Sequence, residues 1–324
     1  MHSTFFIFPG QGSQYRGMGS DLVGEFSAAR DVFDRASSAL GYDMAALCFE
    51  DAGGELDKTR FTQPALLTHE IACLEAFRSL VGDGVAARIA AGHSLGEYTA
   101  LVCAGALGFE DAVLLVAERG RLMSELGRGS MLATTLDLDT AKPLADKHYC
   151  GIGGCNLADQ TVIAGADPDL DALTEELTRE HPRKRAVRLN TEGAFHSYLM
   201  VAAAERFRPI LEATELAPLE VDVLSNYTGS LHESDADAIR SRLFFQLFNP
   251  VLWTTCFERA IDAGVDTIVE FGGGIGKADE PAGKRANLEG IVKKSLKWRE
   301  HEAQYAAAIN VAGIRAAAEL FANR

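Results

Sequence analysis

A single serine between two glycines, Ser94, could act as a nucleophile. The stretch Gly92-His93-Ser94-Leu95-Gly96 has the G-x-S-x-G pattern, and it follows a predicted strand and precedes a predicted helix. Glycines on both sides permit a sharp turn that exposes the serine hydroxyl at the helix N-terminus, where backbone N–H groups and the helix dipole favour an anionic oxygen. The alternative is a serine that merely fills a tight turn, so the pattern alone leaves both roles open.

A serine nucleophile needs a base, and His196 is the candidate among the eight histidines. It lies in "EGAFHSYLM", after a Gly-Ala turn and Phe195 and before an amphipathic helix. His93 is expected to point away from Ser94 and to hold loop structure. A histidine in an apolar setting is more often a hydrogen-bonded core residue than a base, so that alternative stays open. Five other histidines are expected at the surface: His69, His148, His181, His232 and His301.

Strands and helices must position these residues, and their pattern predicts an α/β fold. Apolar runs followed by a glycine-bearing turn and a helical pattern occur at "TFFIFPGQGS", "ARIAAGHSLG" and "DTIVEFGGG", as is typical of a parallel sheet. Residues 130–191 differ, because "SMLATTLDL", "QTVIAG" and "KRAVRLN" read as short strands and "DLDALTEELTREH" reads as a helix. We predict a large α/β subdomain formed by 1–129 and 192–324 and a small α+β insert formed by 130–191.

Composition excludes several classes of protein. The chain of 324 residues has a formal net charge of −15, which disfavours nonspecific binding to nucleic acid or anionic membranes. No run of about 18 apolar residues could cross a bilayer, and the N-terminal apolar run breaks at Pro9 and Gly10, so we expect a cytoplasmic protein. The six cysteines show no C-x-x-C spacing, so neither a metal site nor a disulfide framework is expected.

Eight stretches in order resemble the malonyl-CoA:acyl carrier protein transacylase family, which includes the acyltransferase domains of polyketide and fatty acid synthases. They are "FIFPGQGSQYRGMG", "FTQPALLT", "AGHSLGEYTALVCAGAL", "RGRLM", "TVIAG", "GAFHSYLM", "SNYTG" and "QLFNPVLW", and they span nearly the whole chain. The resemblance implies an α/β fold, with a large α/β-hydrolase-like subdomain built on a parallel sheet and a small ferredoxin-like α+β insert.

The resemblance also implies roles for the catalytic residues. Ser94 would form an acyl-enzyme ester, and His196 would take its proton and later activate the thiol of a carrier protein's phosphopantetheine arm. The backbone carbonyl of Gln246 would orient the histidine in place of a carboxylate. Gln11 would stand with the backbone N–H of Leu95 as the oxyanion hole.

Substrate choice depends on Arg119 in this family. An arginine at this position makes a bidentate pair with the free carboxylate of a malonyl or methylmalonyl group, whereas Arg121 is expected at the surface. "GAFHS" is closer to the malonyl-type motif than to the methylmalonyl-type one. The substrate-binding set that the resemblance implies is Arg119, Gln63, His93, Asn156 and Phe195.

Some positions depart from the family pattern and leave the acyl group less securely specified. Gly273 stands where a proline is usual, and the loop after it is polar and longer. Leu132 stands where a small residue is common, and "CNLADQTVIAG" lacks a proline often found there. The insert lines the acyl pocket in this family, so these departures bear on the acyl group rather than on the chemistry.

The sequence therefore predicts a stand-alone, monomeric acyltransferase that moves a malonyl-type group from a CoA thioester to an acyl carrier protein by a two-step route, without metal or redox cofactor. Three alternatives remain: a carrier-to-carrier acyltransferase for a larger acyl unit, an acyl hydrolase that edits stalled carriers, and an inactive carrier-binding scaffold. Carrier recognition helices are acidic, so a local basic face is expected. The first choice is Lys293, Lys294, Lys297 and Arg299, and the second is Arg183 and Arg185.

Overall fold

The computed structural model describes residues 3–82 and 85–322 and divides into two compact units. The first unit comprises Met1–Gly120, Glu215–Leu224 and Ala260–Arg324, and the second comprises Arg121–Thr214 and Ser225–Arg259. The predicted insert, 130–191, lies wholly within the second unit. That unit extends beyond the insert because later segments bond to its sheet: the Val251 N–H donates to the Gly153 carbonyl at 3.1 Å.

The first unit is built on a five-stranded parallel sheet with the order β7-β2-β1-β8-β9. Its strands are β1 (Thr4–Phe8), β2 (Ile89–Gly92), β7 (Asp222–Val223), β8 (Thr267–Phe271) and β9 (Gln304–Ala308). Every residue of β1, β2 and β8 is buried, as expected for a parallel sheet covered on both faces. The three strands predicted from the sequence are therefore confirmed, whereas β7 and β9 were not predicted.

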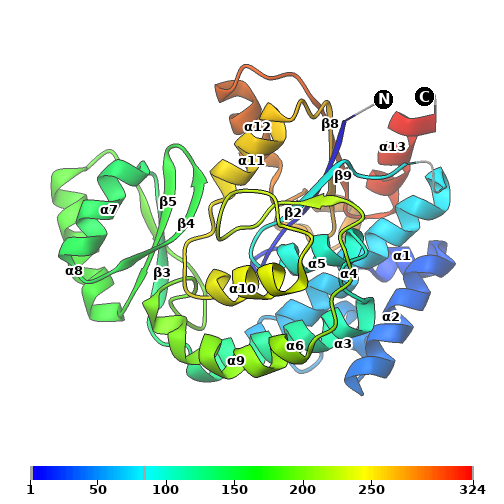
Figure 1. Ribbon diagram of the computed structural model, residues 1–324, viewed down its shortest axis with the longest axis horizontal. Coiled ribbons are helices and arrows are strands. Elements are labelled where there is room, and N and C mark those ends of the chain that lie inside the picture. Colours follow the sequence, from blue (N-terminus) through cyan, green and yellow to red (C-terminus); the bar gives the residue numbers. More distant parts are fainter. Residues whose placement is uncertain (1–2, 83–84, 323–324) are drawn as a thin grey trace. The chain divides into compact units, whose positions relative to one another are not determined.

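Helices surround this sheet (Figure 1). Those of the first unit are α1 (Ser20–Glu25), α2 (Ser27–Leu40), α3 (Met44–Phe49), α4 (Thr59–Val81), α5 (Gly96–Cys103), α12 (Glu289–Trp298) and α13 (Val311–Ala322), with a 3₁₀ turn, η2, at Pro281–Gly283. Aromatic packing joins α4 to the sheet, because the Phe77 ring makes edge contacts with Phe6 and Phe271 at centroid distances of 6.0 and 5.3 Å. The helices α6 (Phe109–Leu126) and α11 (Trp253–Asp262) each continue from one unit into the other.

The surface position predicted for His69 is wrong, because α4 is buried over most of its length. The His69 side chain is fully buried, and burial lowers its pKa to about 3. The Gly273 N–H donates to its Nδ1 at 3.0 Å, which ties the turn after β8 to α4. His232 is also buried, so two of the five histidines expected at the surface are not there.

The sheet of the second unit has four antiparallel strands in the order β4-β5-β3-β6. Its elements follow one another as β3 (Ser130–Thr134), α7 (Leu138–Lys147), β4 (Gly151–Leu157), β5 (Gln160–Gly165), α8 (Asp167–Glu180) and β6 (Ala186–Arg188). This βαββαβ succession with this strand order is ferredoxin-like, so the predicted fold class is confirmed. The chain continues through η1 (Tyr198–Met200), α9 (Val201–Ala213) and α10 (Ala236–Gln246).

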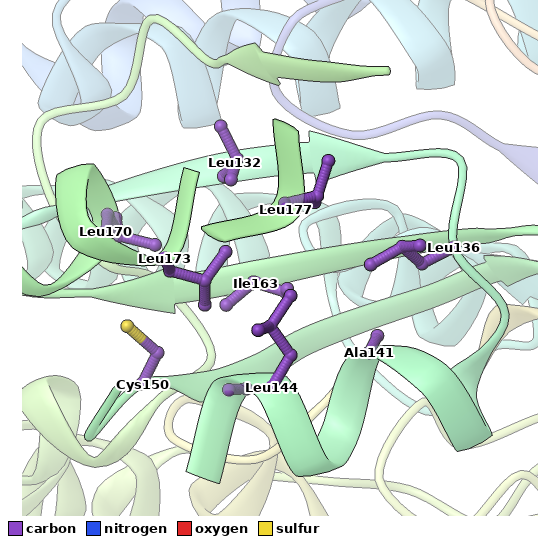
Figure 2. Packing of buried hydrophobic residues seen from close by; sticks show 10 residues of the cluster. Leu132, Leu136, Ala141, Leu144, Cys150, Ile163, Leu170, Leu173 and Leu177 are labelled. Atoms are coloured by element: carbon purple, nitrogen blue, oxygen red, sulfur yellow. The ribbon is translucent and has the colours of Figure 1, made fainter. Parts of the chain in front are cut away.

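The two faces of this sheet bury different clusters. Both helices α7 and α8 cover one face (Figure 1), and Leu132 and Ile163 pack there with Leu144, Leu170 and other apolar residues of the helices (Figure 2). Neighbouring residues of a strand point to opposite faces, and Met131, Val162 and Ala164 accordingly belong to a second cluster that contains Phe195. Leu132, the departure from the family pattern, therefore fills the helix-covered core and lies on the other face from Phe195.

A buried carboxyl group links β8 to its surroundings in the first unit. Glu270 is fully buried, its Oε1 accepts the Leu288 N–H at 2.9 Å, and its Oε2 accepts the Tyr305 hydroxyl at 2.7 Å. Burial raises the pKa of Glu270 from its ordinary value of 4.5 to about 7. The folded protein thus holds this proton more tightly than the unfolded chain, so the contribution of Glu270 to stability falls as the pH rises from 4.5 to about 7 and stays low above it.

Glu270→Gln should therefore stabilise the protein at alkaline pH, because the amide is neutral and retains an acceptor for Leu288 and a donor for the Tyr305 oxygen. The expected gain in the free energy of unfolding, relative to the wild type, is about 3 kcal/mol larger at about pH 8 than below about pH 5. Urea unfolding followed by circular dichroism measures it. Glu180→Gln, which removes an exposed charge on α8 in the second unit, is the control. An equal difference between wild type and Glu270→Gln at both pH values would contradict the assignment.

Candidate active site

Ser94 lies on a sharp turn between β2, which ends at Gly92, and α5, which begins at Gly96. Its φ of 55° is in the left-handed region, where a residue with a side chain is strained. Both glycines are required by close approach: a Cβ on Gly92 would lie 1.8 Å from the Gly96 carbonyl carbon, and one on Gly96 would lie 2.3 Å from the Phe8 oxygen. The predicted strand, turn and helix are confirmed, and the turn places Ser94 at the N-terminus of α5.

The loop after β1 lies directly against this turn. A Cβ on Gly10 would be 2.4 Å from the His93 oxygen, and the His93 N–H donates to the Phe8 carbonyl at 2.9 Å. His93 thus holds the loop through its backbone, as expected. Among the described residues, neither the Gln11 N–H nor the Leu95 N–H donates to a protein acceptor. Two backbone donors beside the serine are therefore left for a developing oxyanion.

Arg119, on α6, lies beside the serine hydroxyl. Its Nη2 donates to Ser94 Oγ at 3.1 Å, and its Nη1 donates to Gln63 Oε1 at 2.8 Å. The guanidinium also lies over the Tyr98 ring, 5.2 Å from the ring centroid. Arg119 is fully buried, and burial lowers its pKa, an effect opposed by the nearby Tyr98 and Glu97. A buried cation at the nucleophile favours an acyl group that carries a carboxylate.

Arg121 contrasts with Arg119 although only Gly120 separates them. Its side chain is 38% exposed and its Nη1 pairs with Glu125 at 2.7 Å along the same helix. The predicted surface position of Arg121 is confirmed, which makes it a matched control for substitutions of Arg119.

His196, in the second unit, is held by the C-terminal end of α10. Its Nδ1 lies 2.7 Å from the Gln246 carbonyl oxygen, and its N–H donates to the Leu247 carbonyl at 3.2 Å. A carbonyl oxygen only accepts, so Nδ1 carries the proton and Nε2 is the unprotonated nitrogen, which is the form that can act as a base. The backbone φ of 60° is again strained, and the side chain is 5% exposed. The Asn249 amide donates to the Phe245 carbonyl at 2.8 Å and so fastens the end of α10.

Two of the expected substrate-binding residues also lie in the second unit. Phe195 is buried in the cluster that contains Met131 and Met200, so it supports the turn that carries His196. Asn156 lies on β4 and is partly buried. The structure thus groups Gln11, Gln63, Ser94 and Arg119 in the first unit and His196, Gln246, Phe195 and Asn156 in the second.

The polar loop that follows β8 supports the Gln11 loop. Gly273 has a φ of 64°, which a proline cannot adopt, so the backbone of this loop requires a residue other than the usual proline. The Gly274 N–H donates to the Ser13 carbonyl at 2.7 Å, and the Lys284 ammonium lies 4.7 Å from the centroid of the Tyr15 ring. This departure from the family pattern therefore changes a supporting loop and leaves the Ser94 turn intact.

The basic face nominated on α12 is partly neutralised. Lys293 pairs with Glu289, and Arg299 pairs with Asp262 at 2.6 Å. Because α12 connects parallel strands, its C-terminal end, with Lys297 and Arg299, lies near the start of β8 and β9, whereas Ser94 follows the end of β2. This position does not favour Lys297 and Arg299 as carrier contacts.

The other nominated cations are all exposed. Lys294 lies on α12, and Arg183 and Arg185 lie in the segment before β6. The Arg185 backbone is fixed, because its N–H donates to the Thr135 hydroxyl at 2.9 Å. These three side chains are accessible to a partner, and their role in carrier binding stays a prediction.

Sequence reasoning missed two residues of the site, Thr59 and Tyr98. Thr59 begins α4, and its Oγ1 accepts the Gln11 side-chain amide at 3.1 Å. Tyr98 is fully buried beneath the Arg119 guanidinium. The spacing of Thr59 and Gln63, four residues apart at the start of a helix, was the available signal, because such residues share a helix face.

Comparison with known proteins shows the family to which the chain belongs. The chain matches the acyl transferase domain family over residues 5–272 and belongs to that family. It is 40% identical to a malonyl CoA-acyl carrier protein transacylase from Bacillus subtilis (strain 168) over 303 residues, which cover 91% of this chain and 90% of that protein.

Solved structures show the same similarity over the whole chain. The crystal structure of a malonyl CoA-acyl carrier protein transacylase from Clostridium perfringens Atcc 13124 superposes with a TM-score of 0.88 at 33% identity, covering 99% of this chain and 98% of that one. A malonyl-transacylase solved in complex with its type II PKS acyl-carrier protein superposes with a TM-score of 0.87 at 32% identity, covering 98% of this chain and 99% of that one.

Among residues 3–82 and 85–322, no helix combines the length and the apolar character required to span a membrane.

Proposed function

We propose that this chain is a malonyl-CoA:acyl carrier protein transacylase, which transfers the malonyl group from CoA to the phosphopantetheine thiol of an acyl carrier protein. The observation that carries the proposal is the fully buried Arg119, whose guanidinium lies 3.1 Å from Ser94 Oγ. A guanidinium in this position can pair with the free carboxylate of a malonyl group while the thioester carbonyl lies at the serine. An uncharged acyl group cannot form that ion pair.

The first half-reaction forms an ester. Ser94 Oγ attacks the thioester carbonyl, His196 Nε2 takes the hydroxyl proton, and the carbonyl oxygen becomes an anion that the N–H groups of Gln11 and Leu95 stabilise. The C–S bond then breaks, and the CoA thiolate leaves with the proton from His196. In the second half-reaction the carrier thiol gives its proton to His196 and attacks the ester, and Ser94 recovers its proton as the C–O bond breaks. The Gln246 carbonyl holds His196 in the required tautomer throughout.

The relatives support the donor and the acceptor of this reaction. The Bacillus subtilis relative is named for malonyl CoA and acyl carrier protein, and one structural relative was solved with an acyl-carrier protein bound. We infer the same classes of donor and partner for this chain, acting as a cytoplasmic monomer. The chemistry needs only the thioester and the side chains above, and no metal or redox cofactor takes part in the proposal.

Two of the departures from the family pattern are weaker evidence against a malonyl group once the fold is known. Leu132 lies in the helix-covered core of the insert, and Gly273 lies in a loop that supports Ser13 and Tyr15. Both retain a structural explanation without a larger acyl pocket. The buried Arg119 therefore supports a malonyl donor over the alternative of a larger non-malonyl acyl unit.

Arg119→Leu tests the proposal, because it removes the carboxylate partner and retains Ser94. The rate at which malonyl-CoA acylates Ser94 should fall about a hundredfold relative to the rate with acetyl-CoA, since loss of one partner of a buried charge pair costs a few kcal/mol. Intact-mass spectrometry of the protein at short times measures both rates. Arg121→Leu is the matched control and should behave as the wild type. The malonyl assignment would be refuted if Arg119→Leu lowered the acylation rates with malonyl-CoA and with acetyl-CoA equally. It would also be refuted if malonyl-CoA did not acylate the wild-type protein.

A further inference from the structure

The N-terminal end of α4 contacts two different parts of the active site. Thr59 accepts the Gln11 side-chain amide at 3.1 Å, and Gln63, one turn later, accepts Arg119 Nη1 at 2.8 Å. Thr59 and Gln63 are 0% and 1% exposed, so both acceptor side chains are buried, whereas Gln11 itself is partly exposed. Residues four apart share a helix face, which explains how the same end of α4 can contact both Gln11, of the oxyanion hole, and Arg119, the expected partner of the carboxylate.

Thr59 is itself held in place by α6. Gly120, the residue after Arg119, packs so closely that a Cβ on it would lie 2.6 Å from the Thr59 carbonyl oxygen. The α4 and α6 backbones are therefore in contact at this point. A movement of Thr59 toward α6 is blocked, and its hydroxyl presents a fixed partner to the loop after β1.

The Gln11 side chain depends on that hydroxyl. Its Nε2 bonds to Thr59, while its Oε1 is buried without a hydrogen-bond partner among the described residues. An amide held by this one bond has little else to determine its orientation, and losing the bond would leave its nitrogen, like its buried oxygen, without a protein partner. The Gln11 backbone N–H, one of the two donors beside Ser94, belongs to the same residue and moves with it.

We propose that Thr59 is a positioning residue for the oxyanion hole, which fixes Gln11 and acts on acyl transfer whatever the charge of the acyl group. The inference rests on the proposed function for the role of Gln11. The proposal gives the two hydrogen bonds different roles. The bond from Gln11 to Thr59 positions the oxyanion hole, which acts on the carbonyl oxygen of any ester or thioester. The bond from Arg119 to Gln63 positions the arginine that selects a carboxylate.

Thr59→Val and Thr59→Ser test this division, because valine keeps the branched shape and removes the hydroxyl, whereas serine keeps the hydroxyl. The acylation rate constant of Ser94 is measured by stopped-flow with malonyl-CoA and with p-nitrophenyl acetate, an uncharged ester that passes through the same kind of oxyanion. Thr59→Val should slow both reactions by a similar factor of at least about ten, since small displacements of catalytic groups cost up to about a hundredfold in rate. Thr59→Ser should retain most of the rate.

Three results would overturn the proposal. Thr59→Val could match the wild type with both donors, or it could slow malonyl-CoA alone, which would assign Thr59 to the carboxylate side. It could also lower the labelled fraction of protein, seen by intact mass, while the rate constant stays at the wild-type value, which is the signature of a purely structural role. The p-nitrophenyl acetate comparison decides the proposal even where malonyl-CoA proves not to be the donor, so failure of the proposed function is distinguishable.

Discussion

Ser94→Ala should reduce transfer of the malonyl group to carrier protein by at least about 10⁴-fold, because it removes the oxygen that carries the acyl group between the two thiols. Ser94 has a φ of 55° on the sharp turn after β2, and no other residue of that turn carries a hydroxyl: they are Gly92, His93, Leu95 and Gly96. Intact-mass spectrometry after mixing with malonyl-CoA measures the consequence directly. The wild type gains the mass of one malonyl group, and the variant gains none.

Two further variants make this result specific to the hydroxyl. Ser38→Ala removes an exposed hydroxyl that bonds within α2 and should leave the adduct unchanged. Ser94→Gly should be as inactive as Ser94→Ala but melt at a higher temperature, because glycine relieves a left-handed backbone strain of about 1 kcal/mol or more. A malonyl adduct that persists in Ser94→Ala would move the nucleophile to another residue and overturn the assignment.

The features that the sequence predicted well are those set by neighbouring residues. The strand, turn and helix around Ser94 follow from two glycines four residues apart, and the structure shows that both are required by contacts closer than a side chain permits. The small α+β insert follows in the same way from short strands with turn residues at their ends, and its ferredoxin-like topology was implied by the family resemblance. Arg119 and Arg121 were separated by the family motif, and one is fully buried while the other is 38% exposed.

The features that the sequence did not predict depend on tertiary contacts. His69 has polar neighbours in the sequence, yet α4 is buried on nearly all sides, so its position is set by the sheet and by Gly273. The strand β9 has the sequence QYAAA, which is weak in β-branched residues, and it forms because β8 offers it an edge. Thr59 was missed because its partner, Gln11, is far away in the chain.

Runs of basic residues are a third case, because the sequence gives their charges but does not show which of them form ion pairs with acidic residues in the fold. The run "KKSLKWR" is the most basic of the chain's C-terminal part, but acidic residues from the same helix and from the end of α11 pair with Lys293 and Arg299. The parallel connection also carries the end of α12 away from the edge of the sheet at which Ser94 lies. The sequence alone does not show which end of the sheet a basic residue lies near. We therefore favour testing Lys294, Arg183 and Arg185 for carrier binding before Lys293, Lys297 and Arg299.

His196→Ala should slow acylation of Ser94 by about 10³-fold, within the range that a positioned general base contributes. The base is defined by geometry, because the Gln246 carbonyl at 2.7 Å keeps the proton on Nδ1 and leaves Nε2 to accept one. His148→Ala is the control, since that imidazole pairs with Glu176 on the insert. Stopped-flow release of CoA measures the first half-reaction, and transfer from the pre-formed malonyl-enzyme to holo carrier protein measures the second.

The two half-reactions of His196→Ala should respond differently to pH, and this difference separates a base from a residue that only supports the turn. A thiol with a pKa near about 8.5 becomes its own nucleophile at alkaline pH, so transfer to the carrier should recover as the pH rises, whereas the serine hydroxyl stays protonated and acylation should not recover. A structural role would depress both half-reactions by the same factor at every pH. Equal recovery of both, or of neither, would therefore remove His196 from the proton transfer and leave it as the strained anchor of its turn.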